Sequence, residues 1–336
     1  MDLLKELLGS ASAYKPWIIA PFITMNATLS LIETIQRLFY FQNSEIVGTV
    51  SELYIVPIRS TKPLRVTSCE LSWTALKRNR KMAVYETSPE LTILDGMRLE
   101  PCEVLNITSR LVGEDEVRCS YAGKEDLLIR YSDVEGGERI SITEADGRDY
   151  IEVGIQADEW FSSILERPVK LLFCPETTLA GEWNTTVYRS PDRSPVPTSP
   201  LLVLGESSVA RISEMAGYEV EMERFRPSIV VDNSLPFEED WWQVVRIGDE
   251  VEIEQSFVNP RCGVINGLAG TYSPKTMNTL FKHGFRDTRN RACLGVRFKV
   301  LRPGTIREGD KITLLRKLSE RKCGPYQLTN ELMVGG

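Results

Sequence analysis

The chain has 336 residues, about twice the length of a typical domain, so two domains or one elaborate domain are expected. Charged residues make up 26% and apolar residues 42%, which is ordinary for a globular protein and excludes bulk disorder. The net charge of -7, from 40 basic and 47 acidic residues, gives no reason to expect binding to nucleic acid.

The N-terminal segment, residues 1–45, contains an apolar stretch at residues 17–32, WIIAPFITMNATLSLI. This stretch is short for the roughly 20 residues needed to span a bilayer, and no small-residue cleavage site follows it. Apolar residues recur at helical spacing near its end: Ile32, Ile35, Leu38 and Phe39. The sequence therefore predicts a helical segment that lies either on a membrane surface or against the protein's own core.

From residue 46 the pattern changes to short strands separated by Gly, Pro, Asp and Asn. Six segments are rich in β-branched or aromatic residues: IVGTVSELYIVPI, KMAVYE, EVRCSY, DLLIRY, YIEVGI and VKLLFC. A helix is expected at DEWFSSILE, where apolar residues share one face. Many short strands with few helices favour β-barrels or sandwiches, so the predicted class is mainly β with a few helices (α+β).

The segment YRSPDRSPVPTSP, residues 188–200, contains four prolines and cannot continue a helix or a central strand. It is either a surface connection or an ordered loop at a site, because binding residues concentrate on loops held by a rigid scaffold. The helix ESSVARISEMAG is expected after it and should end at Gly217. A hairpin-like pair, WWQVVRIGDEVEIEQSFVNPRC, then leads into Cys262, which we expect at the end of a strand.

The seven cysteines include no CxxC pair, and their odd number suits a reducing, intracellular compartment. A zinc ribbon is therefore excluded. The single histidine, His283, excludes an HExxH site, argues against a Ser-His-Asp triad, and is expected on the surface or at the end of a short helix. The nucleotide-binding patterns GxxxxGK[ST] and GxGxxG do not occur.

Several segments taken together resemble a MOSC domain, the molybdenum-cofactor domain shared by cofactor sulfurases and amidoxime-reducing proteins. They are TSPLLVL, ESSVARIS, MERFRPSIVVD, PFEEDWWQVVRIGD, NPRC and LGVRFKVLRPGTIREGDKITLL. Upstream, VSELYIVPIRSTKPLRVTSCELSWTALKRNRKMAVYE resembles the N-terminal β-barrel domain that accompanies it. The resemblance implies two β-barrel-like domains, residues 46–187 and 188–320, followed by a tail at 321–336.

The resemblance implies that Cys262 gives molybdenum its one protein thiolate, beside the pterin dithiolene and oxo ligands. A thiolate is a soft donor that must be deprotonated to bind, and the adjacent Arg261 would favour that form. Gly263 leaves room for the cofactor near the backbone. Arginine suits the pterin phosphate because its guanidinium binds oxyanions at two points. The implied cofactor-binding residues are Arg59, Ser60, Arg80, Thr198, Ser199, Arg226 and Arg261.

The remaining cysteines match no motif and are expected to be structural: Cys69, Cys102, Cys119, Cys174, Cys293 and Cys323. The chain also departs from the family pattern. Arg59 stands where relatives usually have lysine, and Ser228 where asparagine is usual. After Cys262 the chain reads GVINGLAGTYSP instead of V-D-P-x-T-G, with Asn266 alone in step. Arg297 replaces an aromatic residue found near the cofactor in some relatives. We therefore expect altered substrate geometry.

These observations lead to the hypothesis of a reductase that depends on the molybdenum cofactor (Mo-molybdopterin) and acts on N-hydroxylated compounds such as amidoximes, hydroxamates or hydroxylamines. No ferredoxin-type cysteine run follows residue 316, so a separate electron donor is implied, a b-type cytochrome with its NADH-dependent reductase. The resemblance points to the mitochondrial outer membrane. Two alternatives stay open: a non-catalytic carrier of the cofactor or of persulfide sulfur on Cys262, and a scaffold that has lost the site.

Overall fold

The computed structural model describes residues 44–73, 75–87, 92–94, 103–142, 148–174, 199–233, 235–268, 271–272 and 274–321. The chain divides into two units, Met1–Glu45 and Ile46–Gly336, and the fold below belongs to the second unit. The predicted N-terminal helix and most of the proline-rich segment lie outside the described residues. Among the helices that are described, none is long and apolar enough to cross a membrane.

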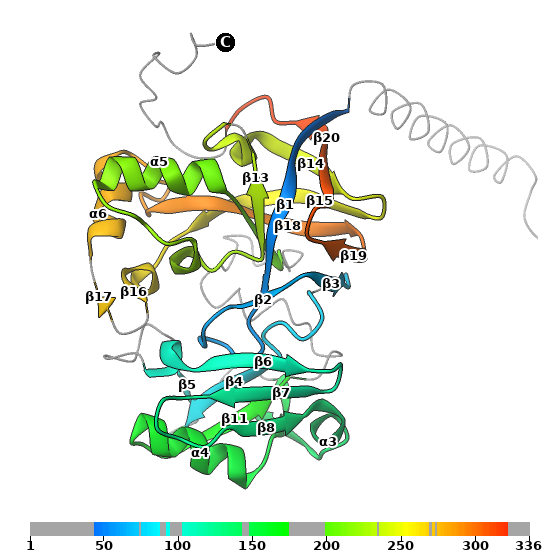
Figure 1. Cartoon of the computed structure of the whole chain (residues 1–336), viewed down its shortest axis with the longest axis vertical. Helices are drawn as coiled ribbons and strands as arrows, with labels where there is room; N and C mark the ends of the chain where they lie inside the picture. Colours follow the sequence, from blue (N-terminus) through cyan, green and yellow to red (C-terminus); the bar gives the residue numbers. More distant parts are fainter. Residues whose placement is uncertain are drawn as a thin grey trace, which may run out of the picture. The chain divides into compact units, whose positions relative to one another are not determined.

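The C-terminal part of the fold is a closed barrel of seven strands (Figure 1). Its strands are β1 (Glu45–Ile55), β12 (Leu201–Gly205), β13 (Ile229–Asp232), β14 (Trp242–Ile247), β15 (Val251–Pro260), β18 (Cys293–Arg302) and β20 (Lys311–Lys317). They follow the order β1-β13-β12-β18-β15-β14-β20, and β20 pairs with β1 to close the ring. β12 and β13 are parallel, with Val203 opposite Ile229, whereas β15 and β18 form a long antiparallel pair. Closure leaves none of these strands with an open edge.

Alternation along the strands fills the barrel with apolar side chains. Strand β18 shows this, since Val296 and Phe298 are fully buried in the barrel core while Arg297 between them is partly exposed. The short strand β2 (Leu64–Val66) extends the sheet beside β1, and β3 (Ser68–Leu71) pairs with β19 (Gly304–Arg307).

A second core lies outside the barrel, under two helices that pack on each other, α5 (Glu206–Ala216) and α6 (Lys275–Lys282). As predicted, α5 ends at Gly217, whose φ of 73° is easily adopted without a side chain. His283 is the C-cap residue of α6, which confirms its predicted place. Short elements complete this part: η3 (Met222–Phe225), η4 (Glu238–Trp241), η5 (Gly263–Asn266), β16 (Gly267–Leu268) and β17 (Thr271–Tyr272).

The N-terminal half forms two sheets. The five-stranded sheet has the order β5 (Thr92–Ile93), β4 (Met82–Glu86), β11 (Val169–Phe173), β10 (Arg148–Glu152) and β9 (Arg139–Ile142). The three-stranded sheet contains β6 (Thr108–Val112), β7 (Glu116–Ser120) and β8 (Leu127–Arg130). Three helices accompany them: η1 (Glu103–Asn106), α3 (Tyr131–Glu135) and α4 (Ile155–Leu165). Side chains of both sheets and of α4 share one core.

The predicted class, mainly β with a few helices, is confirmed. The prediction of two barrel-like domains is confirmed only for the barrel described above, because the strands described in the N-terminal half stay in two open sheets. Moreover, β1, which we assigned to the first domain, pairs with β13 and β20 and closes the C-terminal barrel. The predicted boundary at residues 187–188 lies outside the described residues and stays a prediction.

Candidate functional site

Cys262 lies between the end of β15 and the start of η5, as expected for a residue at a strand end. The antiparallel pairing of β15 continues to Pro260, and the Arg261 N–H then donates to the Ala292 carbonyl at 2.7 Å. Cys262 is exposed, whereas the other cysteines that the structure describes are buried: Cys69, Cys119, Cys174 and Cys293. Burial raises the pKa of the Cys69 thiol to about 11, so that thiol stays protonated at neutral pH. Among the described cysteines, Cys262 is thus the accessible ligand.

The space beside this thiol is open. A Cβ at Gly263 would meet no protein atom within 4 Å, in agreement with the room that we expected there. Across the described ranges, no three His, Cys, Asp or Glu side chains gather as a metal-binding group. The Cys262 thiol therefore stands at an open position and outside any such group of described side chains.

Four arginine side chains from four separate segments come together: Arg59 after β1, Arg80 before β4, Arg226 at the end of η3, and Arg297 on β18. We call them the arginine cluster. Burial lowers the pKa of the Arg80 guanidinium, and the guanidinium groups of Arg297, Arg226 and Arg59 lower it further. Like charges that lower one another's pKa repel each other, so an anion that binds between these guanidinium groups would relieve the repulsion.

Three predicted site residues have left-handed backbone conformations that non-glycine residues rarely adopt. The φ angles are 70° at Ser60, 53° at Arg80 and 51° at Arg226. Backbone hydrogen bonds hold two of them, because the Arg80 N–H donates to the Val56 carbonyl at 2.6 Å and the Arg226 N–H to the Glu223 carbonyl at 3.1 Å. Strain of this kind tends to gather where the position of a side chain matters for binding.

The loops that carry the cluster are tied to one another. Arg226 Nη2 donates to the Thr61 carbonyl at 2.6 Å, which joins η3 to the loop after β1. The Arg59 N–H donates to the Met82 carbonyl at 2.7 Å, which joins the same loop to the start of β4. The loops that carry Arg59, Arg80 and Arg226 are therefore joined to one another by the fold.

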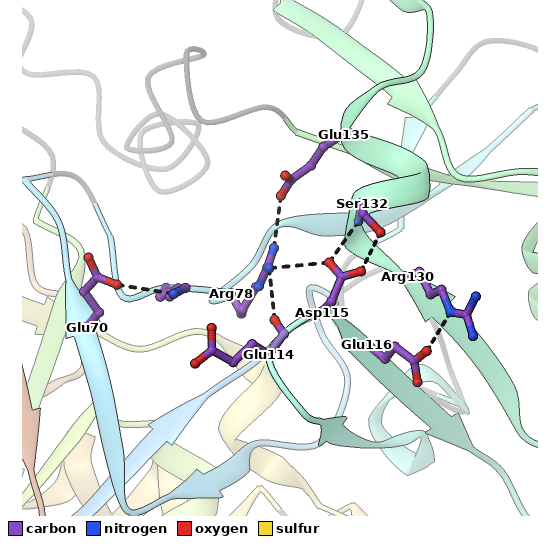
Figure 2. A network of polar contacts seen from close by, with 9 residues as sticks. Glu70, Arg78, Glu114, Asp115, Glu116, Arg130, Ser132 and Glu135 are labelled. Atoms are coloured by element: carbon purple, nitrogen blue, oxygen red, sulfur yellow. Dashed lines mark hydrogen bonds and ion pairs between the residues drawn. The ribbon is translucent and has the colours of Figure 1, made fainter.

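Arg78 holds the turn that carries Arg80 (Figure 2). Its Nη1 donates to Glu135 Oε1 at 3.0 Å, and its Nη2 donates to the Glu114 carbonyl at 3.0 Å. The Arg78 Cζ also lies 3.8 Å from the centroid of the buried Tyr131 ring. One side chain thus attaches this turn to α3 and to the hairpin before β7.

Neighbouring contacts complete the network in Figure 2. Asp115 accepts a hydrogen bond from the Ser132 N–H at 3.0 Å and another from the Ser132 hydroxyl. Arg130 Nε donates to Glu116 Oε1 at 2.6 Å in an exposed pair. The network therefore contains two arginines: Arg78, in the turn that carries Arg80, and Arg130, on the surface of the three-stranded sheet.

The side chains of Arg261 and Arg297 make contacts that the sequence does not reveal. Arg261 Nη1 donates to the Phe225 carbonyl at 2.8 Å and its Nη2 to the Leu294 carbonyl at 2.5 Å, so its guanidinium joins η3 to β18. Arg297, which we named only as a departure from the family pattern, belongs to the arginine cluster, and its Nε donates to Asn259 Oδ1 at 2.8 Å. The available signal was alternation on β18, which turns Arg297 away from the barrel core.

Ser199 offers a hydroxyl to a ligand. It is buried, and its Oγ has no hydrogen-bond partner among the described residues. It precedes β12, and the parallel pairing of β12 with β13 brings this end close to the segment after Arg226. Thr198 lies outside the described residues. A buried polar atom without a partner costs free energy unless a ligand bonds to it. Taken together, the Ser199 hydroxyl, the arginine cluster and the Cys262 thiol fit a ligand that combines a thiophilic metal with a phosphate.

The divergent segment after Cys262 is held in place by Arg224, which is buried. Its Nη1 donates to the carbonyls of Asn266 at 3.3 Å and Ile265 at 3.5 Å, while its Nε donates to Glu221 Oε2 at 2.5 Å. Arg224 therefore joins η5 to η3. No signal in the sequence predicted this contact between Arg224 and the segment after Cys262.

The sequence of the chain is similar to those of several known proteins. A family model described as "MOSC domain" matches residues 190–313. The chain is 30% identical over 295 residues to mitochondrial amidoxime-reducing component 1 of Mus musculus, which covers 80% of this chain and 83% of that protein. It is 26% identical over 297 residues to mitochondrial amidoxime reducing component 2 of Bos taurus, with 79% and 83% covered. The YuaD protein of Bacillus subtilis aligns with a TM-score of 0.38 at 10% identity, over 81% of this chain and 96% of that one, which is too weak to support a conclusion.

Proposed function

We propose, since this chain belongs to the MOSC-domain family, that it is a molybdenum-cofactor-dependent reductase of N-hydroxylated compounds. The observation that carries the proposal is an exposed thiol, Cys262, three residues after Asn259, which accepts a hydrogen bond from Arg297 of the arginine cluster. The distant similarity to proteins named amidoxime-reducing components favours this substrate class over other oxidised compounds.

Each residue of the site then has a role. The Cys262 thiolate would bind molybdenum, and the arginine cluster would bind the phosphate of the pterin together with Ser60, Thr198 and Ser199. Arg261 would hold the segment that carries Cys262 through its bonds to Phe225 and Leu294. When bound, the cofactor would accept the substrate oxygen and supply two electrons as the N–O bond breaks.

The balance of the reaction requires a reductant. The substrate gains two electrons and two protons, the N–O bond is cleaved, and the oxygen leaves as water. We propose that a b-type cytochrome and its NADH-dependent reductase supply these electrons, and that the N-terminal segment places the chain on a membrane surface near them, as the mitochondrial names of the relatives suggest.

The molybdenum content of the purified chain tests the thiolate site. We expect about one metal per chain in the wild type produced in a host that makes the cofactor, and strong depletion in Cys262→Ala and Cys262→Ser. The variant Cys69→Ala, which removes a buried thiol, should keep its metal if it folds, as judged by circular dichroism. Wild-type chain without metal, or equal metal in all variants, would contradict the proposal, and loaded chain that reduces no amidoxime with a chemical reductant would contradict the activity.

The exposure of Cys262 also favours a second candidate, a sulfur carrier that holds a persulfide on this thiol. Mass spectrometry of intact chain distinguishes the two. A stable gain of one sulfur atom that disappears in Cys262→Ala, with no pterin bound, would support the carrier.

A further inference from the structure

The position of the Cys262 thiol depends on the backbone on either side of it, because this exposed side chain makes no capping hydrogen bond to η5. On the N-terminal side, the Arg261 guanidinium donates to the Phe225 carbonyl in η3 and to the Leu294 carbonyl in β18. On the C-terminal side η5 follows directly, and the Ile265 N–H donates to the Cys262 carbonyl at 3.3 Å. A contact that fixes η5 therefore also fixes the backbone of Cys262.

Arg224 supplies that contact. Its Nη1 donates to the Asn266 carbonyl at 3.3 Å and to the Ile265 carbonyl at 3.5 Å, at the end of η5. The last carbonyls of a helix have no partner within the helix, so a donor from outside must satisfy them. Arg224, Ile265 and Asn266 are only 6%, 3% and 5% exposed, so water cannot easily replace this donor.

Glu221 orients the Arg224 guanidinium from its other side. Arg224 Nε donates to Glu221 Oε2 at 2.5 Å, and Arg224 Nη2 donates to Glu221 Oε1 at 3.4 Å. A carboxylate that meets a guanidinium at two points sets the plane of the guanidinium as well as its place. Since Glu221 is the N-cap residue of η3, this orientation comes from the same short segment of chain.

The helix η3 therefore contacts the chain on both sides of Cys262. It does so through the Phe225 carbonyl before the cysteine and through the Arg224 side chain after it. The next residue, Arg226, belongs to the arginine cluster and donates to the Thr61 carbonyl. Three successive residues thus serve both parts of the candidate site, the thiol and the guanidinium groups.

We propose that Arg224 is a positioning residue that holds η5, keeps the Cys262 thiol in one orientation relative to η3, and thereby slows the loss of molybdenum. The inference rests on the proposed function, because that function makes Cys262 the metal ligand. Groups that orient a metal ligand without touching the metal typically change metal affinity about 10–100-fold. Because Arg224 contacts backbone carbonyls, which every sequence provides, the altered side chains after Cys262 leave this support intact.

The rate of molybdenum loss tests the proposal. Cofactor-loaded wild type and Arg224→Met are dialysed against cofactor-free buffer, and the metal content is followed with time. We expect the variant to lose its metal about tenfold faster. The electron paramagnetic resonance spectrum of the partly reduced metal, which reports the orientation of the thiolate ligand, should also change.

Arg321→Met is the matched control. The Arg321 side chain is 12% exposed and pairs with the buried Asp240 in η4, so its removal should also lower the free energy of unfolding. The rate of metal loss and the spectrum should nevertheless stay those of the wild type. An unchanged rate in Arg224→Met, an equal rise in both variants, or an unchanged spectrum in Arg224→Met would overturn the proposal.

A milder variant tests the route through Glu221. The Glu221 side chain is 41% exposed, so Glu221→Gln should fold even if Arg224→Met does not. It should speed metal loss less than Arg224→Met does, and it should have no further effect when the two changes are combined, because Glu221 acts through Arg224. The same effect of Glu221→Gln in both backgrounds would overturn this route.

Hydrogen exchange separates this inference from the proposed function. In metal-free chain, the backbone amides of η5, including that of Ile265, should exchange faster in Arg224→Met than in the wild type, whereas Arg321→Met should leave them unchanged. If the wild type holds no molybdenum, the proposed function fails, and this measurement still decides whether Arg224 holds η5. Unchanged exchange at η5 in Arg224→Met would overturn the inference at any metal content.

Discussion

Arg78 acts on the candidate site through Arg80, two residues further on. Its side chain is only 18% exposed and lies over the Tyr131 ring. It bonds Glu135 and the Glu114 carbonyl (Figure 2). The Arg78 guanidinium is held by a ring face, a carboxylate and a carbonyl. The turn that it anchors therefore loses little further freedom when Arg80 binds a ligand. Arg78 is therefore a positioning residue, and its effect should exceed that of an ordinary surface arginine.

The matched pair Arg78→Met and Arg130→Met tests this position. We expect Arg78→Met to lower the free energy of unfolding by about 1–2 kcal/mol and to reduce the molybdenum content, because the turn that carries Arg80 loosens. Arg130→Met breaks the exposed pair with Glu116 and should cost less than about 1 kcal/mol, with unchanged metal. Urea denaturation and metal analysis give both quantities. Equal metal content in the two variants would show that Arg78 stabilises the fold and does not position the site.

The predicted site residues show what a sequence can reveal at this scale. Cys262 was predicted from its neighbours in the chain, and the structure adds that its thiol is exposed, while its role as a metal ligand stays a prediction. The guanidinium of Arg261 bonds two backbone carbonyls, which its place in the chain could not show, because the direction of a side chain depends on non-local packing. Its contact with the cofactor stays a prediction. Arg297 lies 36 positions after Arg261 in a strand, and only the pairing of β15 with β18 brings it to the site.

At the scale of elements, local pattern predicted strands and helices better than it predicted their partners. The β-branched and aromatic residues of EIVGTVSELYI indicate a strand, and β1 is one. Its partners β13 and β20 lie far along the chain, so no local signal shows that β1 closes the barrel. The helix α5, by contrast, depends on its own apolar face and on Gly217, both of which can be read locally.

The closure of the barrel by β1 depends on a close approach at Gly48. A Cβ there would lie 2.5 Å from the Asp232 carbonyl oxygen and 2.8 Å from Val231 Cγ1, so the pairing of β1 with β13 would have to shift. We expect Gly48→Ala to cost about 1–3 kcal/mol of unfolding free energy. Gly136→Ala is the control, because a Cβ at Gly136 meets nothing within 4 Å and its φ is -86°. Urea denaturation that gives the same midpoint for both variants would show that β1 can move without cost.

At the scale of the whole molecule, charge is distributed unevenly. The chain carries a net charge of -7, yet the arginine cluster makes the site locally positive. Two neighbouring acidic side chains, Glu239 and Asp240, are instead buried. Glu239 accepts hydrogen bonds from the Gly205 N–H at 3.0 Å and from Ser208 Oγ at 2.9 Å. It thereby joins η4 to β12 and α5. Burial, and next the negative charge of Asp240, raise the pKa of Glu239 to about 7.

This buried carboxyl makes the stability of the whole chain depend on pH. The pKa of Glu239 in the folded state exceeds its ordinary value, so the folded state keeps a proton that the unfolded state releases. The contribution of this proton to the free energy of unfolding is therefore complete below about pH 4.5 and disappears as the pH rises through about 7. Relative to Glu239→Gln, which cannot ionise, the wild type should lose about 2–3 kcal/mol of unfolding free energy between about pH 5 and 8. Glu159→Gln, at an exposed carboxylate, should parallel the wild type in urea denaturation across this range. If wild type and Glu239→Gln instead differ by a constant amount from pH 5 to pH 8, Glu239 is charged throughout, and its hydrogen bonds outweigh the cost of its burial.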